Sequence, residues 1–121
     1  MLVDVRTRPE WDFVGGPDLS ELGKDTIRVE WKSWPDMSPN PAFAEALLNE
    51  VGTLPSAFLF ICRSGARSMQ AAQAVAEVLV SKGEAGSCIN VAEGFEGDLA
   101  ADGRRGGLNG WKARGLAWRQ S

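Results

Sequence analysis

The fold of this chain is most constrained by a run of five apolar residues at 57–61 (AFLFI), which ends at Cys62. An uninterrupted apolar run of this length is typical of a central strand buried on both faces of a sheet. A turn follows at Gly65, and residues 66–82 carry apolar side chains at helical spacing up to a stop at Gly83. Because a buried strand that leads directly into a helix is the repeating unit of α/β proteins, we expect an α/β fold with a mainly parallel sheet.

The rest of the chain supplies further strands and helices, and its 121 residues have the length of one domain, residues 1–121. Apolar and β-branched runs predict the strands, whereas Asn40 and Pro41 are typical of a helix start. The expected strands are 2–5, 27–31 and 87–91, the expected helices are 8–13, 41–51 and 110–115, and residues 94–110, with six glycines, form a long loop. In the 66–82 helix the expected apolar stripe is Met69, Ala72, Ala76, Leu79 and Val80.

Composition limits the chemistry that the chain can perform. Histidine is absent and only two cysteines occur. This excludes a Ser-His-Asp triad, a Cys-His pair and a zinc site with four Cys or His ligands, so we expect no metal. Any chemistry must use cysteine, carboxylate, arginine, lysine, serine or backbone groups.

Charge and hydropathy narrow the expected partners and compartment. The net charge of −3 weighs against a general nucleic-acid binder, and no apolar run reaches the roughly 18 residues of a membrane span. No signal peptide is visible, so Cys62 and Cys88 are expected to be free thiols in the cytoplasm. Residues 104–121 carry five basic and no acidic side chains, which we expect to form a solvated face, with an anion-attracting rim as the alternative.

Cys62 lies where a buried strand gives way to a helix, and three effects converge on its sulfur. A helix N-terminus supplies free N–H groups, and a turn through Gly65 can direct consecutive N–H groups inward. Arg63 and Arg67 add two positive charges. Each effect favours thiolate over thiol, so the sequence predicts a reactive nucleophile. The alternative is a structural thiol beside two solvated arginines, but cations are disfavoured at a helix N-terminus unless an anion lies between them.

Residues 62–68 (CRSGARS) resemble the active-site loop of the rhodanese family of sulfurtransferases, which reads Cys-Arg-x-Gly-x-Arg followed by Ser or a similar residue. The segment Asp4-Val5-Arg6 with Glu10 resembles the family's Asp-Val-Arg…Glu element, and Gly110-Trp111 resembles part of its Gly-Gly-Trp region. The resemblance extends over nearly the whole chain.

This resemblance implies a three-layer α/β fold with a five-stranded, mainly parallel sheet flanked by helices. It also implies covalent transfer of sulfane sulfur from a small anionic donor such as thiosulfate to a thiol or cyanide acceptor, through a persulfide on Cys62 and without a cofactor. The active-site loop would cradle the terminal sulfur with its backbone N–H groups and attract the donor with its arginines. Its members are Arg63, Ser64, Gly65, Ala66, Arg67 and Ser68.

The chain departs from the family pattern in three places. The short strand and helix that precede the family's Asp-Val-Arg strand have no counterpart, because Leu2 already begins that strand. The family's Gly-His-Ile-Pro-Gly element is replaced by residues 14–18 (VGGPD), and the 94–110 loop is an insertion, expected to be a surface loop or a border of the site. Arg6 and Glu10 are expected to form a structural ion pair, and Cys88 to be a core residue.

Two other functions compete with small-molecule sulfur transfer. Tyrosine phosphatases and related arsenate reductases use a Cys-x5-Arg loop, but here only four residues separate Cys62 from Arg67, which suits a single sulfur atom better than a phosphate. A rhodanese-like module can also serve binding or regulation, or carry a persulfide to a partner protein in a sulfur relay. Trp31, Trp34 or Trp111 are candidates for the pocket wall.

Overall fold

The apolar run at 57–61 forms β6 (Ala57–Ile61), a central strand of the sheet in the computed structural model, which describes residues 1–120. The sheet has four strands in the order β3 (Ile27–Arg28), β1 (Leu2–Asp4), β6 and β7 (Ser87–Asn90). All three strand pairs are parallel, with Asp4 beside Ile61 and Phe60 beside Asn90. The carboxyl ends of β1, β6 and β7 therefore meet at one edge of the sheet, where ligands bind in folds of this class.

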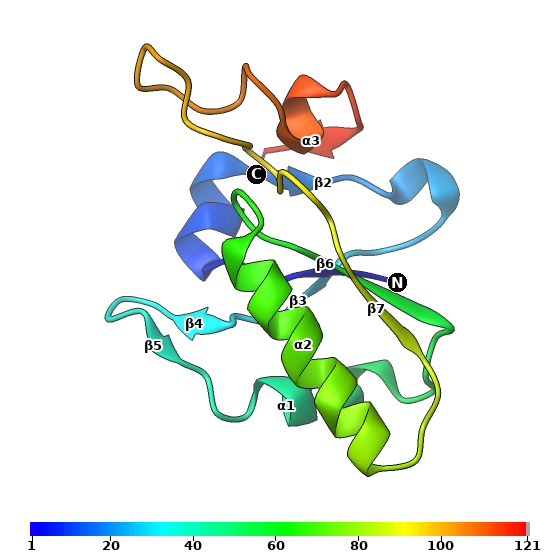
Figure 1. The fold of residues 1–121 in the computed structure, drawn as a ribbon. Coiled ribbons are helices and arrows are strands. Elements are labelled where there is room, and N and C mark those ends of the chain that lie inside the picture. Colours follow the sequence, from blue (N-terminus) through cyan, green and yellow to red (C-terminus); the bar gives the residue numbers. More distant parts are fainter. Residues whose placement is uncertain (121) are drawn as a thin grey trace.

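Two helices cover one face of this sheet, α1 (Phe43–Val51) and α2 (Ala66–Ser81). In the view of Figure 1, α1 lies below the strands and α2 runs downward from their level. The core between them and the sheet is apolar and nearly inaccessible to water. It is made of Val3, Val5, Phe43, Leu47, Phe58, Phe60, Cys62, Ala71, Ala72, Val75 and Leu79. Burial of these side chains supplies the main driving force for packing the helices on the sheet.

The other face is covered by shorter elements, namely the helical turn η1 (Glu10–Val14), the helix α3 (Gly110–Ala113) and the loop before it. A second apolar cluster holds them to the sheet, with Leu2, Ile61 and Phe95 at its centre. The remaining elements are the turn η2 (Ser20–Leu22), the antiparallel pair β2 (Gly16–Pro17) and β8 (Trp118–Arg119), and the hairpin β4 (Lys32–Ser33) and β5 (Ser38–Pro39).

Several expectations are corrected by this arrangement. The four sheet strands are those that the apolar runs predict, whereas the fifth, expected from the resemblance alone, is formed by no part of residues 1–120. The predicted 27–31 strand is shorter, although Val29 and Trp31 still donate backbone hydrogen bonds to the β1 segment. Met69 and Val80 of the predicted apolar stripe are exposed, because the buried face of α2 lies elsewhere. That face is made of Ser68, Ala71, Ala72, Val75 and Leu79. None of the helices described is long and apolar enough to cross a membrane.

Candidate active site

Cys62 directly follows β6, at the carboxyl edge of the sheet, and its residue surface is only 1% exposed. Two polar groups reach its sulfur. The Gly65 N–H donates to Sγ at 3.1 Å, and the Ser68 hydroxyl lies 3.2 Å from it. Both come from the start of α2, so the sulfur lies at the positive end of a 16-residue helix. The helix start and the backbone donor that the sequence predicts therefore lie beside the sulfur.

Gly65 makes the turn that directs its N–H at the sulfur. Its φ of 118° lies in the region that favours glycine, and the residue precedes the first turn of α2. A Cβ atom at this position would meet no atom closer than 3.7 Å, so backbone conformation rather than space requires glycine here. The predicted Gly turn is therefore present, and it points the Gly65 N–H at the Cys62 sulfur.

Ser68 is fully buried and links Cys62 to the next strand. Its Oγ lies 3.2 Å from the Gly65 carbonyl oxygen and makes a short hydrogen bond to Asn90 Oδ1. Asn90, at the end of β7, was not among the predicted site residues. Its place at the carboxyl end of a neighbouring parallel strand is the signal that could have identified it.

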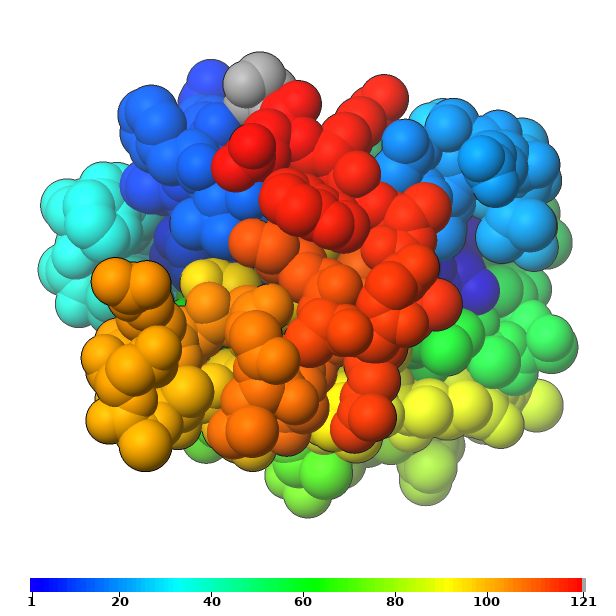
Figure 2. Space-filling model, turned by 90° about the horizontal axis from the view of Figure 1, so that it is seen from above, coloured from blue at the N-terminus to red at the C-terminus, as the bar shows by residue number. Residues whose placement is uncertain are grey.

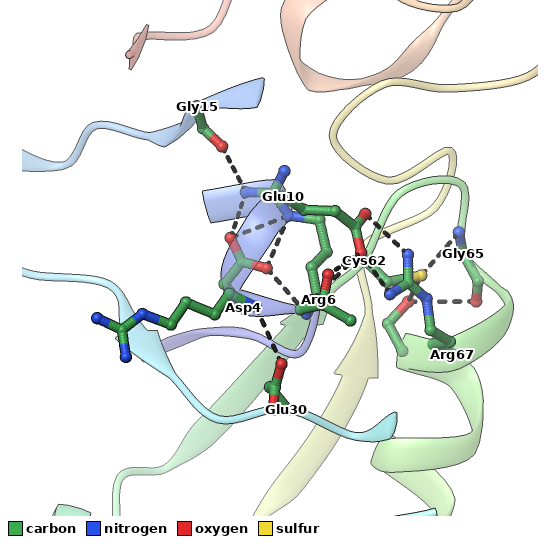
Figure 3. Close-up of polar contacts among 11 residues, drawn as sticks. Asp4, Arg6, Glu10, Gly15, Glu30, Cys62, Gly65 and Arg67 are labelled. Atoms are coloured by element: carbon green, nitrogen blue, oxygen red, sulfur yellow. Dashed lines mark hydrogen bonds and ion pairs between the residues drawn. The ribbon is translucent and has the colours of Figure 1, made fainter. Parts of the chain in front are cut away.

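Arg67 is engaged by a carboxylate rather than free to meet a ligand. Glu10 of η1 accepts two hydrogen bonds from its guanidinium, at 2.7 and 3.0 Å, and Figure 3 shows the two side chains meeting beside Cys62. Burial by itself raises the pKa of the Glu10 carboxyl, but hydrogen bonds and charge from Arg67, with hydrogen bonds from Thr7, outweigh it and hold the pKa below its ordinary value. Arg67 therefore cross-links the active-site loop to η1.

The expected pairing of Arg6 with Glu10 is wrong. Arg6 instead forms a fully buried ion pair with Asp4, at 2.7 Å, and donates to the Gly15 carbonyl oxygen, also at 2.7 Å. Its guanidinium lies 4.5 Å from the centre of the Phe95 ring. These contacts join the end of β1 to the chain on the second face of the sheet and do not reach Cys62.

The segment after β7 holds the backbone of the active-site loop. The Phe95 N–H donates to the Cys62 carbonyl oxygen at 2.7 Å, and the Glu96 and Gly97 N–H groups donate to that of Arg63 at 3.0 and 3.1 Å. The two backbones approach so closely that a Cβ on Gly94 would lie 2.5 Å from the Arg63 carbonyl group. The 94–110 loop therefore borders the site and is anchored there. Of the two expectations for this loop, a surface loop or a border of the site, the second is confirmed.

A cavity of about 700 Å³ opens above this loop and includes Cys62 in its lining. Its walls come from η1, the β4–β5 hairpin, the Cys62 loop and the 94–110 loop. In Figure 2 the blue, cyan and orange residues of η1, the hairpin and the long loop gather on one side of the molecule. The lining residues are Thr7, Pro9, Glu10, Phe13, Val14, Lys32, Trp34, Met37, Cys62, Arg63, Ser64, Ala66, Arg67, Glu96 and Arg105.

The other singled-out residues have different places. Of the three candidate tryptophans, Trp34 lines the cavity, whereas Trp31 packs edge-on against Phe43 and Trp111 joins the second apolar cluster. Cys88 in β7 packs against the main core, and its burial raises the pKa of its thiol. Within residues 1–120, no group of three or more carboxylates and cysteines is placed to hold a metal ion.

Comparison with known proteins identifies relatives that align with nearly the whole of this chain. RC0915 from Rickettsia conorii is 33% identical over 117 residues, which make up 97% of this chain and 80% of that protein. RP600 from Rickettsia prowazekii is 32% identical over 118 residues, with the same coverage. The crystal structure of Rv0390 from M. tuberculosis superimposes with a TM-score of 0.80 and 45% identity, covering all of this chain and 84% of that one. No family model matches the chain. The chain thus belongs to the family of these rickettsial proteins and shares the fold of Rv0390.

Proposed function

We propose that this protein is a sulfurtransferase of the rhodanese type, which carries sulfane sulfur as a persulfide on Cys62. The observation that carries the proposal is the environment of the Cys62 sulfur, which receives the Gly65 N–H and lies against the Ser68 hydroxyl at the base of a cavity. The loop that builds this environment, residues 62–68, is the segment that resembles the rhodanese active site.

The first step forms the persulfide. The Cys62 thiolate attacks the outer sulfur of a donor such as thiosulfate, the sulfur–sulfur bond of the donor breaks, and sulfite leaves with the electron pair. The terminal sulfur of the new persulfide carries the negative charge. N–H groups at the start of α2 can donate hydrogen bonds to this charged sulfur, since the first turn of a helix has unpaired donors.

The second step returns the enzyme to its starting state. The thiolate of an acceptor, or cyanide, attacks the terminal sulfur, and the bond to Cys62 breaks with the electron pair returning to the Cys62 thiolate. No cofactor takes part. Arg63, which is exposed and borders the cavity, is suited to attract anionic donors, whereas Arg67 holds the loop through Glu10.

The fold is consistent with this assignment in its parallel sheet and its helix behind the nucleophile, and we assign it to the three-layer rhodanese-like class with one strand fewer among residues 1–120 than the five typical of that class. Both cysteines are free thiols, which suits a reducing compartment such as the cytoplasm. Transfer of the persulfide to a partner protein is the alternative outcome for the same nucleophile.

The test is the intact mass of the reduced protein after brief incubation with thiosulfate. We expect a gain of one sulfur atom, removed by cyanide as thiocyanate appears. Cys62→Ser should abolish the gain, and Cys88→Ser, which alters a thiol outside the cavity, should retain it. A folded wild-type protein that gains no sulfur from thiosulfate or from a persulfide donor would contradict the proposal.

A further inference from the structure

The cavity above Cys62 is larger than a small inorganic donor requires. Its volume of about 700 Å³ lies within the range of about 300–1,000 Å³ typical of pockets that enclose drug-sized organic ligands. Cys62 is one of fifteen lining residues and is 1% exposed, so a ligand must present its reacting sulfur at a narrow tip. The rest of the cavity is available for the body of the ligand.

The outer wall of this cavity is apolar, although it faces solvent. Phe13 on η1 is 82% exposed and Trp34 in the β4–β5 turn is 57% exposed, and Met37 and Val14 extend the same wall. Two large aromatic side chains from separate elements thus converge on one cavity without packing into either core cluster. Exposed apolar surface gathered at a concave site is typical of ligand binding.

The same cavity has an excess of positive charge in a chain whose net charge is −3. Lys32, Arg63 and Arg105 line it. Of the two acidic lining residues, Glu10 is paired with Arg67, so Glu96 is the one left to offset these three cations. Among residues 1–120, the side chains of Lys32 and Arg63 have no hydrogen bond or ion pair. The cavity is therefore suited to an anionic ligand with an apolar body.

We propose that the natural substrate at this cavity is an organic sulfur anion of low molecular weight, whose apolar body lies against Phe13, Trp34 and Met37. The inference rests on the proposed function and specifies its substrate class. The charged group next to the reacting sulfur meets Arg63 and Lys32, and the sulfur itself reaches Cys62. A protein donor is disfavoured because its cysteine would have to enter a cavity whose nucleophile is almost wholly buried.

Thiosulfonate anions are suitable probes, since they join an apolar group to an anionic thiosulfonate group whose outer sulfur is transferable. The Cys62 thiolate attacks the outer sulfur, the bond between the two sulfur atoms breaks, and the sulfinate leaves with the electron pair. We compare benzenethiosulfonate with methanethiosulfonate through the ratio of their second-order rate constants for persulfide formation. Phe13→Ala and Trp34→Ala together should lower this ratio about tenfold.

Leu22→Ala is the matched control, because Leu22 is an apolar side chain whose exposure (69%) lies between those of Phe13 and Trp34 and which lies outside the cavity. It should leave the ratio unchanged. A second measurement does not depend on sulfur transfer. Calorimetric titration of Cys62→Ser with benzenesulfonate and methanesulfonate should show at least tenfold tighter binding of the aromatic anion, lost on Phe13→Ala with Trp34→Ala and weakened by Lys32→Gln.

The outcomes separate this inference from the proposed function. Persulfide formation with a ratio that the aromatic variants leave unchanged, or equal affinity for the two sulfonates, would overturn the inference and leave sulfur transfer intact. Persulfide formation from thiosulfate but from neither thiosulfonate would overturn the inference alone. Absence of persulfide from thiosulfate, from a persulfide donor and from both thiosulfonates would overturn the proposed function, while the titration still decides whether the cavity prefers aromatic anions. If neither sulfonate binds and sulfur moves only to a protein acceptor, the inference of a small organic substrate is overturned in favour of a relay partner.

Discussion

The Ser68 hydroxyl has one proton and three acceptors within reach, namely Cys62 Sγ, the Gly65 carbonyl oxygen and Asn90 Oδ1. With Cys62 as a thiol, the S–H group can donate to Ser68 while Ser68 donates to Asn90. With Cys62 as a thiolate, the proton is needed at the sulfur, and rotation of the Asn90 amide supplies a donor to Ser68 in place of an acceptor. Ser68 and Asn90 together thus allow both the thiol and the thiolate of Cys62 to be hydrogen-bonded.

Ser68→Ala should slow persulfide formation from thiosulfate about 10- to 100-fold, because a hydrogen bond to a charged group contributes about 1.5–3 kcal/mol. The rate is measured by rapid mixing with thiosulfate and mass analysis. Asn90→Ala should slow it less, since Asn90 acts through Ser68. Ser81→Ala, at the opposite end of the same helix, is the matched control and should retain the wild-type rate. Equal rates for Ser68→Ala and wild type would show that the Ser68 hydroxyl does not contribute to persulfide formation.

Glu10 should make the stability of the protein dependent on acidic pH. Its pKa lies below the ordinary value of 4.5, so its pairing with Arg67 stabilises the fold fully above that value. The contribution is lost as the pH falls through the lower pKa of the folded state. Glu10→Gln should reduce the free energy of unfolding at pH 7 by about 1 kcal/mol, and the difference from wild type should shrink below pH 4.5. Urea titrations followed by tryptophan fluorescence measure this, and a difference that grows on acidification would contradict it.

At the scale of elements, the loop after β7 acts as a clamp on the loop after β6. Three backbone hydrogen bonds from residues 95–97 satisfy the carbonyl groups of Cys62 and Arg63. Both segments follow neighbouring parallel strands, so the sheet itself brings them together. The 94–110 loop thus contributes to the shape of the Cys62 loop through its first residues and to the cavity through Arg105.

Gly94→Ala tests this clamp. Gly94 has a φ of 69°, and a Cβ there would lie 2.5 Å from Arg63 backbone atoms, so the two loops must move apart. We expect a loss of about 2–4 kcal/mol in the free energy of unfolding, together with slower persulfide formation. Gly103→Ala is the control, since its φ is also positive at 80° but its Cβ would meet no atom within 4 Å. Equal losses in the two variants would mean that backbone strain alone, and not the clamp, is responsible.

The parts of the site that the sequence predicted are those formed by residues close together along the chain. The β6–loop–α2 unit is contiguous, so its strand, its turn and its helix followed from apolar runs and Gly65. The partner of Arg67 lies 57 positions away, and nothing local indicates Glu10. The Asp4–Arg6 pair was accessible in principle, because residues two apart along an extended segment share a face, but Arg6 was expected to pair with Glu10.

The β4–β5 hairpin shows the opposite limitation. Residues 35–41 predict only a loop because they contain three prolines, and the two short strands that enclose the turn carry no periodic signal. The aromatic wall of the cavity was therefore only partly foreseen, with Trp34 among three candidates and Phe13 absent from them. Convergence of the hairpin with η1 is a property of the tertiary fold.

For the whole molecule, the distribution of charge matters more than its sum. The chain carries a net charge of −3, yet cations surround the entrance to Cys62. The remainder of the surface repels anions weakly, whereas the cavity attracts them over a distance set by the ionic strength. The anionic donor that we propose would thereby be directed to one place on an otherwise acidic protein.

This distribution predicts a salt dependence that a single residue controls. The value of kcat/KM for thiosulfate should fall as ionic strength rises, since screening shortens the range of attraction. Arg63→Gln should lower kcat/KM about fivefold at low salt, as expected from the loss of about 1 kcal/mol of attraction in water, and should flatten the salt dependence. Arg104→Gln removes the same charge from an exposed residue outside the cavity and should change neither value. If the two variants behave alike, the donor responds to the net charge of the protein rather than to the cations at the cavity.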